Sequence, residues 1–292
     1  DEVGRMLGGL QQIKVSLRRM HAVVPAEQAQ ALLNPSHVSL KDPLPPPLAP
    51  HQPEQLETLE VEGLTYRHPS SGQGIVDVSF TLEHGSVTVI TGSVGAGKTT
   101  LLQVLLGLHP RDRGVIRWNG RRVDDPATFF VPPRSAYTPQ VPRLFGETVR
   151  ENVLLGWPAD DAVTREAVHA AVLGRDLEGF ENGLETLVGP RGVRLSGGQV
   201  QRVAAARMLV REAALLVFDD LSSALDAQTE AELWRRLWQR RRGETFLVVS
   251  HRPAVLARAD RVLLMDAGRL VDITPGHEPS SLARPLPLSQ PT

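Results

Sequence analysis

The segment "GSVGAGKTT" (92–100) carries the residue types that bind a polyphosphate. It fits G-x-x-x-x-G-K-[ST] and stands between a β-rich run, "SVTVITG", and a helical segment that starts near Lys98. Glycines let successive backbone N–H groups approach phosphate oxygens, and the helix start adds the positive end of its dipole. The Lys98 ammonium would reach the β- and γ-phosphates, and the Thr99 hydroxyl would ligate Mg²⁺. The site residues that we expect here are Gly92, Ser93, Val94, Gly95, Ala96, Gly97, Lys98, Thr99 and Thr100.

Two adjacent carboxylates close the short apolar run "LLVFDD" (215–220). Such a run is typical of a strand buried on both faces, and acids at its end indicate a sheet edge that meets a charged ligand. Asp219 and Asp220 are therefore candidates for magnesium binding and for base catalysis.

A second anion-binding arrangement occurs in "LSGGQVQRVAAARML" (195–209), where Ser196 and two glycines open a predicted helix. One nucleotide seldom needs two such sites, unless the second serves a neighbouring molecule. The candidate residues are Ser196, Gly197, Gly198 and Gln199.

In this order the motifs resemble the ATP-binding cassette (ABC) family over essentially all of residues 56–273. "GSVGAGKTT" resembles the Walker A loop, "LSGGQ" the signature, "LLVFD" the Walker B strand and "SALD" (223–226) the D-loop. Tyr66 in "LTYRH" falls where the family stacks an aromatic ring on adenine. Gln140 in "AYTPQVPRLF" resembles the Q-loop glutamine, and His251 in "VVSHRP" the switch histidine.

The resemblance implies a binding site for ATP and Mg²⁺, with a role for each matching residue. Thr99, Gln140 and Asp219 would serve the magnesium ion. Gln140 would also have a catalytic role as a sensor of the γ-phosphate, and His251 one through a contact with the γ-phosphate or the attacking water. Two cassettes of the family close head to tail, so Ser196, Gly197 and Gly198 would act on a partner's ATP.

Asp220 departs from the family pattern, which has a glutamate as general base at this position. One methylene fewer withdraws the carboxylate by roughly 1.5 Å, and a misplacement of about 1 Å costs on the order of a hundredfold in rate. The substitution weakens the site that this chain builds for its own ATP, whereas the signature that it would offer to a partner is complete. This asymmetry resembles heterodimeric exporters, so we expect a heterodimer with a cassette that carries the glutamate. A slow homodimeric exporter, a non-transport cassette ATPase and an ATP-binding clamp with little hydrolysis stay open.

Two further segments resemble exporter-type cassettes, "LFGETVRENVLLG" (144–156) and "ETLVGPRGVRLSGGQ" (185–199). Pro190 stands where a glutamate is usual in exporters. The implied partners are a second cassette and the transmembrane domains of an exporter, at the cytoplasmic face of the membrane. The surroundings of Gln140 would receive the coupling helix.

These residues require elements that bring them together. "ALLVFDD" and "TFLVVSH" are predicted strands of a parallel sheet, and "DAVTREAVHAAVL" and "QTEAELWRRLWQRR" have the helical period. "GVIRWNGRRV" predicts a hairpin that turns at Asn119-Gly120, and "RVLLMDAGRLVDI" a closing hairpin. This alternation predicts an α/β fold with a mostly parallel core. The family resemblance implies the finer architecture: a P-loop NTPase core with a mostly parallel sheet, an antiparallel β subdomain and an inserted α-helical subdomain.

Composition shifts divide the chain. Residues 1–33 carry an apolar seam with alternating spacings of three and four, which predicts a helix that packs on another element. The resemblance to exporters implies that this helix continues from a missing transmembrane domain. A proline-rich linker (34–55) leads to the cassette (56–273), in which the helical subdomain covers about 141–207. Residues 274–292 form a proline-rich, flexible tail.

Bulk properties exclude several classes. The formal net charge of −1 gives no general attraction to nucleic acid, and the arginines of "RRLWQRRRG" are typical of a solvated helix end. With 0 cysteines there is neither a disulfide nor a thiolate metal site. No apolar run is long enough to cross a bilayer, so we expect a soluble chain. The sequence does not begin with Met, so we expect an excised piece of a longer protein or a processed product.

Overall fold

The computed structural model describes residues 54–189, 192–221, 224–240 and 243–274. The predicted N-terminal helix and almost all of the predicted linker and tail lie outside these residues. Those predictions, and the domain boundaries drawn from them, stay predictions.

The centre of the fold is a six-stranded sheet in the order β10-β9-β3-β8-β7-β6. The pairings from β9 to β6 are all parallel, and only β10 runs antiparallel to its neighbour. Every residue of β7 and β8 is buried, which explains why both read as continuous apolar runs. The strands are β3 (Val87–Thr91), β6 (Ser135–Thr138), β7 (Leu215–Asp219), β8 (Thr245–Val249), β9 (Arg261–Asp266) and β10 (Arg269–Asp272).

A smaller antiparallel sheet has four strands in the order β2-β1-β4-β5. The predicted turn at Asn119 and Gly120 is confirmed: both residues have positive φ, 51° and 74°, as the tight turn of a two-residue hairpin requires. The closing hairpin of β9 and β10 is confirmed as well. The strands of the smaller sheet are β1 (Thr58–Arg67), β2 (Gly74–Glu83), β4 (Arg113–Trp118) and β5 (Arg121–Arg122).

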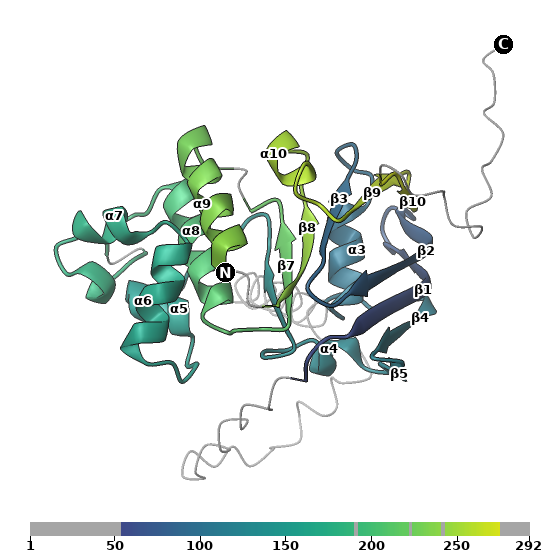
Figure 1. Ribbon diagram of the computed structural model, residues 1–292, viewed down its shortest axis with the longest axis horizontal. Coiled ribbons are helices and arrows are strands. Elements are labelled where there is room, and N and C mark those ends of the chain that lie inside the picture. Colours follow the sequence, from purple (N-terminus) through teal and green to yellow (C-terminus); the bar gives the residue numbers. More distant parts are fainter. Residues whose placement is uncertain (1–53, 190–191, 222–223, 241–242, 275–292) are drawn as a thin grey trace, which may run out of the picture. The chain divides into compact units, whose positions relative to one another are not determined.

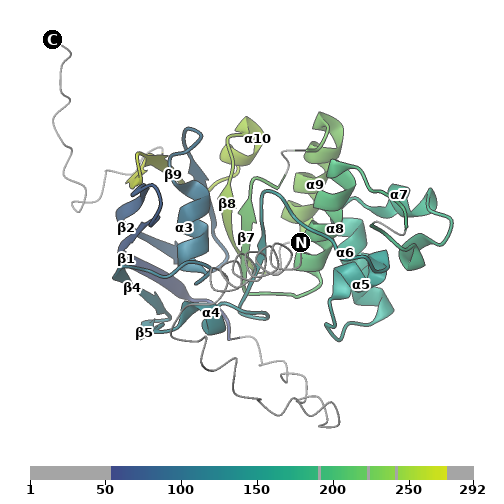
Figure 2. The same ribbon diagram turned by 180° about the vertical axis from the view of Figure 1, so that it is seen from behind.

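The helices follow the strands in the alternation that the sequence predicts. A group of helical segments lies between β6 and β7 in the chain and forms one side of the molecule in Figures 1 and 2. The predicted α/β class, with its parallel core, antiparallel subdomain and helical insertion, is confirmed. The helical elements are α3 (Lys98–Leu105), α4 (Pro126–Phe129), α5 (Val149–Leu154), α6 (Asp161–Ala170), α7 (Gly174–Glu178), η1 (Gly183–Glu185), α8 (Gly197–Leu209), α9 (Ala227–Arg240) and α10 (Pro253–Leu256).

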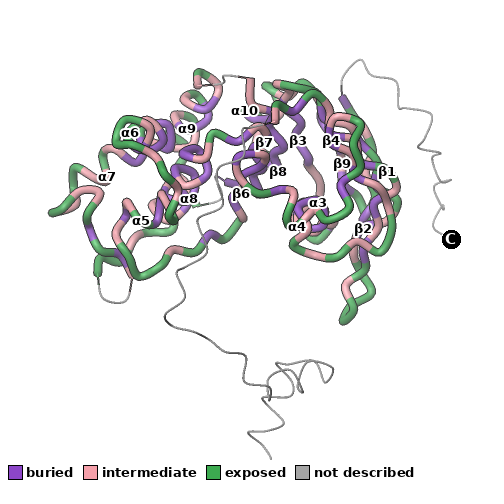
Figure 3. The backbone as a smooth tube through the Cα atoms, turned by 90° about the horizontal axis from the view of Figure 1, so that it is seen from below, coloured by how far each residue is buried: buried purple, intermediate pink, exposed green. Residues whose placement is uncertain are grey.

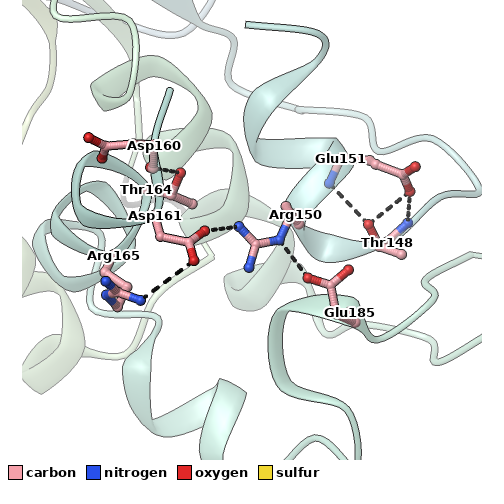
Figure 4. A network of polar contacts seen from close by, with 8 residues as sticks. All are labelled: Thr148, Arg150, Glu151, Asp160, Asp161, Thr164, Arg165 and Glu185. Carbon is pink, nitrogen blue, oxygen red and sulfur yellow. Dashed lines mark hydrogen bonds and ion pairs between the residues drawn. The ribbon is translucent and has the colours of Figure 1, made fainter. Parts of the chain in front are cut away.

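Polar contacts join the short helices of this insertion (Figure 4). Thr148 caps α5 and forms a reciprocal capping box with Glu151. In the first turn of α5, the Arg150 guanidinium donates to Glu185 of η1 and to Asp161 at the start of α6. One side chain therefore ties together three elements that are each too short to be stable alone.

The two faces of the six-stranded sheet pack against different elements. On β7, Leu216 and Phe218 belong to a core with α8 and α9, whereas Leu215 and Val217 belong to a core with α3 and the antiparallel sheet. Figure 3 shows the buried residues that run through β7, β8 and β3. Because side chains alternate along a strand, Asp219 lies on the same face as Val217 and therefore faces α3.

Candidate functional site

The segments predicted to do chemistry follow four neighbouring strands at the same edge of the sheet. Lys98 follows β3, Gln140 follows β6, Asp219 ends β7 and His251 follows β8. Parallel strands end at the same edge, which is where α/β folds bind ligands. The fold thus gathers residues that are more than a hundred positions apart in the chain.

The loop between β3 and α3 has the backbone that a phosphate cradle needs. Gly92 has φ 138°, and a Cβ there would collide with the carbonyl oxygen of Met265 on β9. Gly97 caps α3 with φ 107°. The Lys98 ammonium donates to the carbonyl oxygens of Gly92, at 2.9 Å, and Ser93, at 2.7 Å. The cation therefore lies directly over the loop that would hold the phosphates.

Thr99 and Asp219 are brought together as the sequence predicts. The Thr99 hydroxyl donates to Oδ1 of Asp219 at 3.2 Å, and the hydroxyl of Tyr137 donates to Oδ2 at 3.3 Å. Asp219 is only 1% exposed. Burial raises the pKa of Asp219, and the two hydroxyls oppose that rise by stabilising the carboxylate. Burial and the Asp219 charge likewise raise the pKa of Tyr137 above its ordinary value, so its hydroxyl stays a donor.

These residues fit a Mg²⁺ ion only if a nucleotide shares its coordination. The described parts of the chain hold no group of three or more His, Asp or Glu side chains that could bind a metal ion by themselves. Magnesium in nucleotide sites usually takes one or two protein ligands and completes its shell with phosphate oxygens and water. The pair of Thr99 and Asp219 beside a glycine cradle matches that donor set.

Asp220 adopts a left-handed backbone with φ 50°, a conformation that aspartate tolerates better than most residues. Its N–H donates to the carbonyl oxygen of Val249 on β8 at 3.1 Å. Its Oδ2 accepts from Nε2 of Gln140 at 3.4 Å, whereas Oδ1 is buried and has no hydrogen-bond partner in the structure. Two of the three predicted catalytic residues, Asp220 and Gln140, therefore meet, and one carboxylate oxygen of Asp220 is left for a further donor. His251 lies exposed just past β8.

Tyr66, the residue predicted to stack on adenine, is covered in the structure. It is 5% exposed in the core of the antiparallel sheet, and its ring stacks on His109 with centroids 5.1 Å apart. The half-buried His68 lies nearer the loop, with Nε2 3.3 Å from the Thr100 hydroxyl of α3. The sequence reasoning missed His68. The alternation of β1 was the available signal, because residues two apart on a strand share a face.

The signature residues open α8 as predicted. The Ser196 hydroxyl oxygen accepts from the N–H of Gln199 at 3.2 Å, and the Gln199 side chain accepts from the N–H of Ser196 at 2.8 Å. The side-chain nitrogen Nε2 of Gln199 also donates to Oδ1 of Asp176 at 3.0 Å. A Cβ on Gly198 would approach the carbonyl oxygen of Ala224 to 3.0 Å, which is a tight contact, whereas one on Gly197 would lie at an ordinary 3.5 Å from the Ala224 side chain. The space at position 198 therefore favours glycine.

The segment that resembles exporters surrounds a buried amide. Asn152 accepts from the N–H of Phe145 at 2.8 Å and donates to its carbonyl oxygen at 3.0 Å, which fixes the loop before α5. Val141 and Phe145 are 75% and 59% exposed there, close in sequence to Gln140. Pro190 lies outside the described residues, so its effect stays a prediction. Among the helices in the described ranges, none has the length and apolar character to cross a bilayer.

Comparisons with known proteins agree with this geometry. A family model described as "ABC transporter" matches residues 75–223, just over half of the chain. The chain is 36% identical over 228 residues to a probable multidrug resistance ABC transporter ATP-binding/permease protein of Bacillus subtilis. The matched region covers 76% of this chain and 39% of that protein. The chain is 35% identical over 219 residues to an ATP-dependent lipid A-core flippase of Aromatoleum aromaticum, covering 73% and 36%.

A solved structure, that of a bacterial Atm1-family ABC exporter with ATP bound, superposes with a TM-score of 0.68 at 28% identity and covers 77% of this chain and 39% of that one. The chain thus spans well under half the length of the relatives that it matches. The family resemblance seen in the motifs is confirmed. This chain belongs to the ABC transporter family, and it carries an ATP-binding domain related to those of the family's exporters.

Proposed function

We propose that this domain binds Mg²⁺-ATP at the loop after β3 and hydrolyses it slowly to drive export through transmembrane domains. The observation that carries the proposal is the contact of Thr99 with Asp219 beside Lys98, because it joins a phosphate cradle to a magnesium ligand. Bound Mg²⁺ would neutralise phosphate charge during the transfer. Thr99, Asp219 and Gln140 would hold it, and His251 would bind the γ-phosphate.

For the adenine base, His68 is the better candidate than Tyr66. Its imidazole lies against the first turn of α3, whereas the Tyr66 ring is covered. Replacing His68 with alanine should weaken ATP binding about fivefold, since a ring stacked on a base is worth roughly 1 kcal/mol. The dissociation constant from fluorescent-nucleotide titration checks this prediction.

A matched variant separates the two rings. Tyr66→Phe keeps the buried ring and should leave the ATP affinity within about twofold. Inorganic tripolyphosphate, which has no base, should compete with the nucleotide equally well for binding to both variants and to the unaltered chain. A fivefold loss for tripolyphosphate in His68→Ala would instead mean that His68 acts through Thr100 on the phosphate loop.

The partner is a second cassette, and the substitution at Asp220 favours a different one that carries the usual glutamate. In that heterodimer, the signature of this chain would complete the partner's ATP site. An ATP-binding clamp with little hydrolysis is the second candidate function, and the same substitution supports it. The transmembrane domains would dock near Val141 and Phe145, whose exposed apolar side chains adjoin Gln140.

A charge at position 196 tests the role of the signature in trans. Ser196→Asp keeps a good helix cap but places a carboxylate where a partner's γ-phosphate would lie. We expect nucleotide binding by the monomer to stay within about twofold, and ATP-induced dimerisation to be lost. Analytical ultracentrifugation with Mg²⁺-ATP measures the dimerisation. Ser196→Asp is compared there with Ser196→Thr, the neutral control, both in an Asp220→Asn background. A nucleotide affinity that falls in the monomer would show that Ser196 serves its own site.

A further inference from the structure

Tyr137 contacts the candidate magnesium site, although the sequence assigns no role to it. It lies three residues before Gln140, in the segment "AYTPQVPRLF". It lies on the edge strand β6, where its Cα pairs with that of Val217 on β7. The parallel register puts its side chain on the face that packs against α3, together with Val217 and Asp219. The tyrosine ring is packed against this core, and its hydroxyl reaches along β7 to the carboxylate of Asp219.

The two oxygens of Asp219 each have one hydroxyl partner. Thr99 donates to Oδ1 at 3.2 Å from α3, and Tyr137 donates to Oδ2 at 3.3 Å from β6. The terminal torsion of an aspartate is broad, so an unrestrained carboxylate rotates between several orientations. Donors on opposite oxygens, from elements on either side, remove that freedom. The plane of the carboxylate is thus set by β6 as well as by the phosphate loop.

We propose that Tyr137 is a positioning residue for the magnesium site, because its hydroxyl holds the Asp219 carboxylate in the orientation that Mg²⁺ bound with ATP requires. The inference rests on the proposed function and adds a residue to it. Tyr137 does not touch the nucleotide or the ion in this account. It acts through Asp219, so its loss should change the binding of the metal and leave the binding of the metal-free nucleotide unchanged.

The test compares Tyr137→Phe with a control on the same strand. Thr138 is the next residue, also carries a hydroxyl and is 1% exposed, but its hydroxyl faces the other core and contacts the sulfur of Met208 at 3.3 Å. Thr138→Val therefore removes a buried hydroxyl of β6 without touching Asp219. Both variants keep the shape of the side chain that they replace.

The measured quantity is the dissociation constant of Mn²⁺, used as a paramagnetic probe, from electron paramagnetic resonance at saturating ATP. Tyr137→Phe should weaken Mn²⁺ binding roughly tenfold, since losing a group that orients a metal ligand costs about 10- to 100-fold in metal affinity. Thr138→Val should leave it within about twofold. ATP binding in the presence of EDTA should be unchanged in both variants.

A double-mutant cycle shows whether the effect passes through Asp219. In an Asp219→Asn background, Tyr137→Phe should cause no further loss of Mn²⁺ affinity. The inference is overturned by an unchanged Mn²⁺ affinity in Tyr137→Phe, by an equal loss in Thr138→Val, or by an equal loss of ATP affinity in EDTA. Tyr137→Leu supplies a second hydroxyl-free side chain if the phenylalanine variant does not fold. Failure of the unaltered chain to bind ATP at all would instead contradict the proposed function.

Discussion

Replacing Asp220 with glutamate is expected to raise the steady-state Mg²⁺-ATPase rate about a hundredfold. The added methylene advances the carboxylate by roughly 1.5 Å, and a misplacement of about 1 Å costs on the order of a hundredfold in rate. In the structure, Oδ2 of Asp220 already contacts Gln140 and Oδ1 is buried without a partner.

The backbone at this position requires a stability control. Asp220 has φ 50°, and a glutamate in that left-handed conformation costs about 1 kcal/mol more than an aspartate does. Rates should therefore be compared at a temperature at which thermal melting shows both variants fully folded. Asp220→Asn is the matched variant without a base, and it should abolish the residual activity of the unaltered chain.

The outcomes separate the possible partners. A large gain in the glutamate variant means that the rest of the site is assembled and that position 220 limits it, which favours pairing with a different cassette. Equal rates well above background would contradict the slow-site hypothesis and favour a homodimeric exporter cassette. Equal and negligible rates would mean that the active assembly needs a partner chain.

Replacing Lys98 with alanine is expected to weaken Mg²⁺-ATP binding by about a hundredfold and to remove measurable hydrolysis. The ammonium lies over the loop and contacts the carbonyl oxygens of Gly92 and Ser93. A lysine ammonium has three N–H donors, so these two bonds leave one donor free for a phosphate oxygen. Hydrogen bonds to charged groups contribute about 1.5–3 kcal/mol each, and Lys98 would serve two phosphates. Isothermal titration calorimetry gives the affinity directly.

Lys98→Arg is the matched control for this prediction. It keeps the positive charge but replaces a compact ammonium with a planar fork, which does not fit a loop shaped for a point charge. We expect at least a tenfold loss of affinity in this variant, intermediate between the unaltered chain and Lys98→Ala. Equal affinities for ATP in all three proteins would show that the phosphates bind elsewhere.

Local patterns were enough to predict most of the elements. The continuous apolar runs of β7 and β8 indicated strands buried on both faces, and the structure buries every residue of both. The pair Asn119-Gly120 predicted a tight turn because both residues tolerate positive φ. Glycine spacing before Lys98 predicted a loop that ends at a helix start, and α3 begins at that residue. In each case the signal lies within a few consecutive residues.

Placement across the fold was harder to predict. The sequence assigned the adenine to Tyr66, yet the structure covers that ring with His109 and places His68 beside Thr100. Both residues belong to the same short motif, so spacing alone did not distinguish them. His109, which lies far along the chain, contacts both rings: it stacks on Tyr66 and meets His68 edge-on.

By itself the sequence determined the class of fold, the phosphate loop, the order of the family's motifs and the substitution of aspartate for glutamate at position 220. These follow from residue types and from spacings within single elements. Only the tertiary structure decided that Tyr137 shares Asp219 with Thr99, and that Gln140 meets Asp220. Such contacts depend on the register between β6 and β7, which joins residues some eighty positions apart. Many side chains contribute to that register, and no local pattern encodes it.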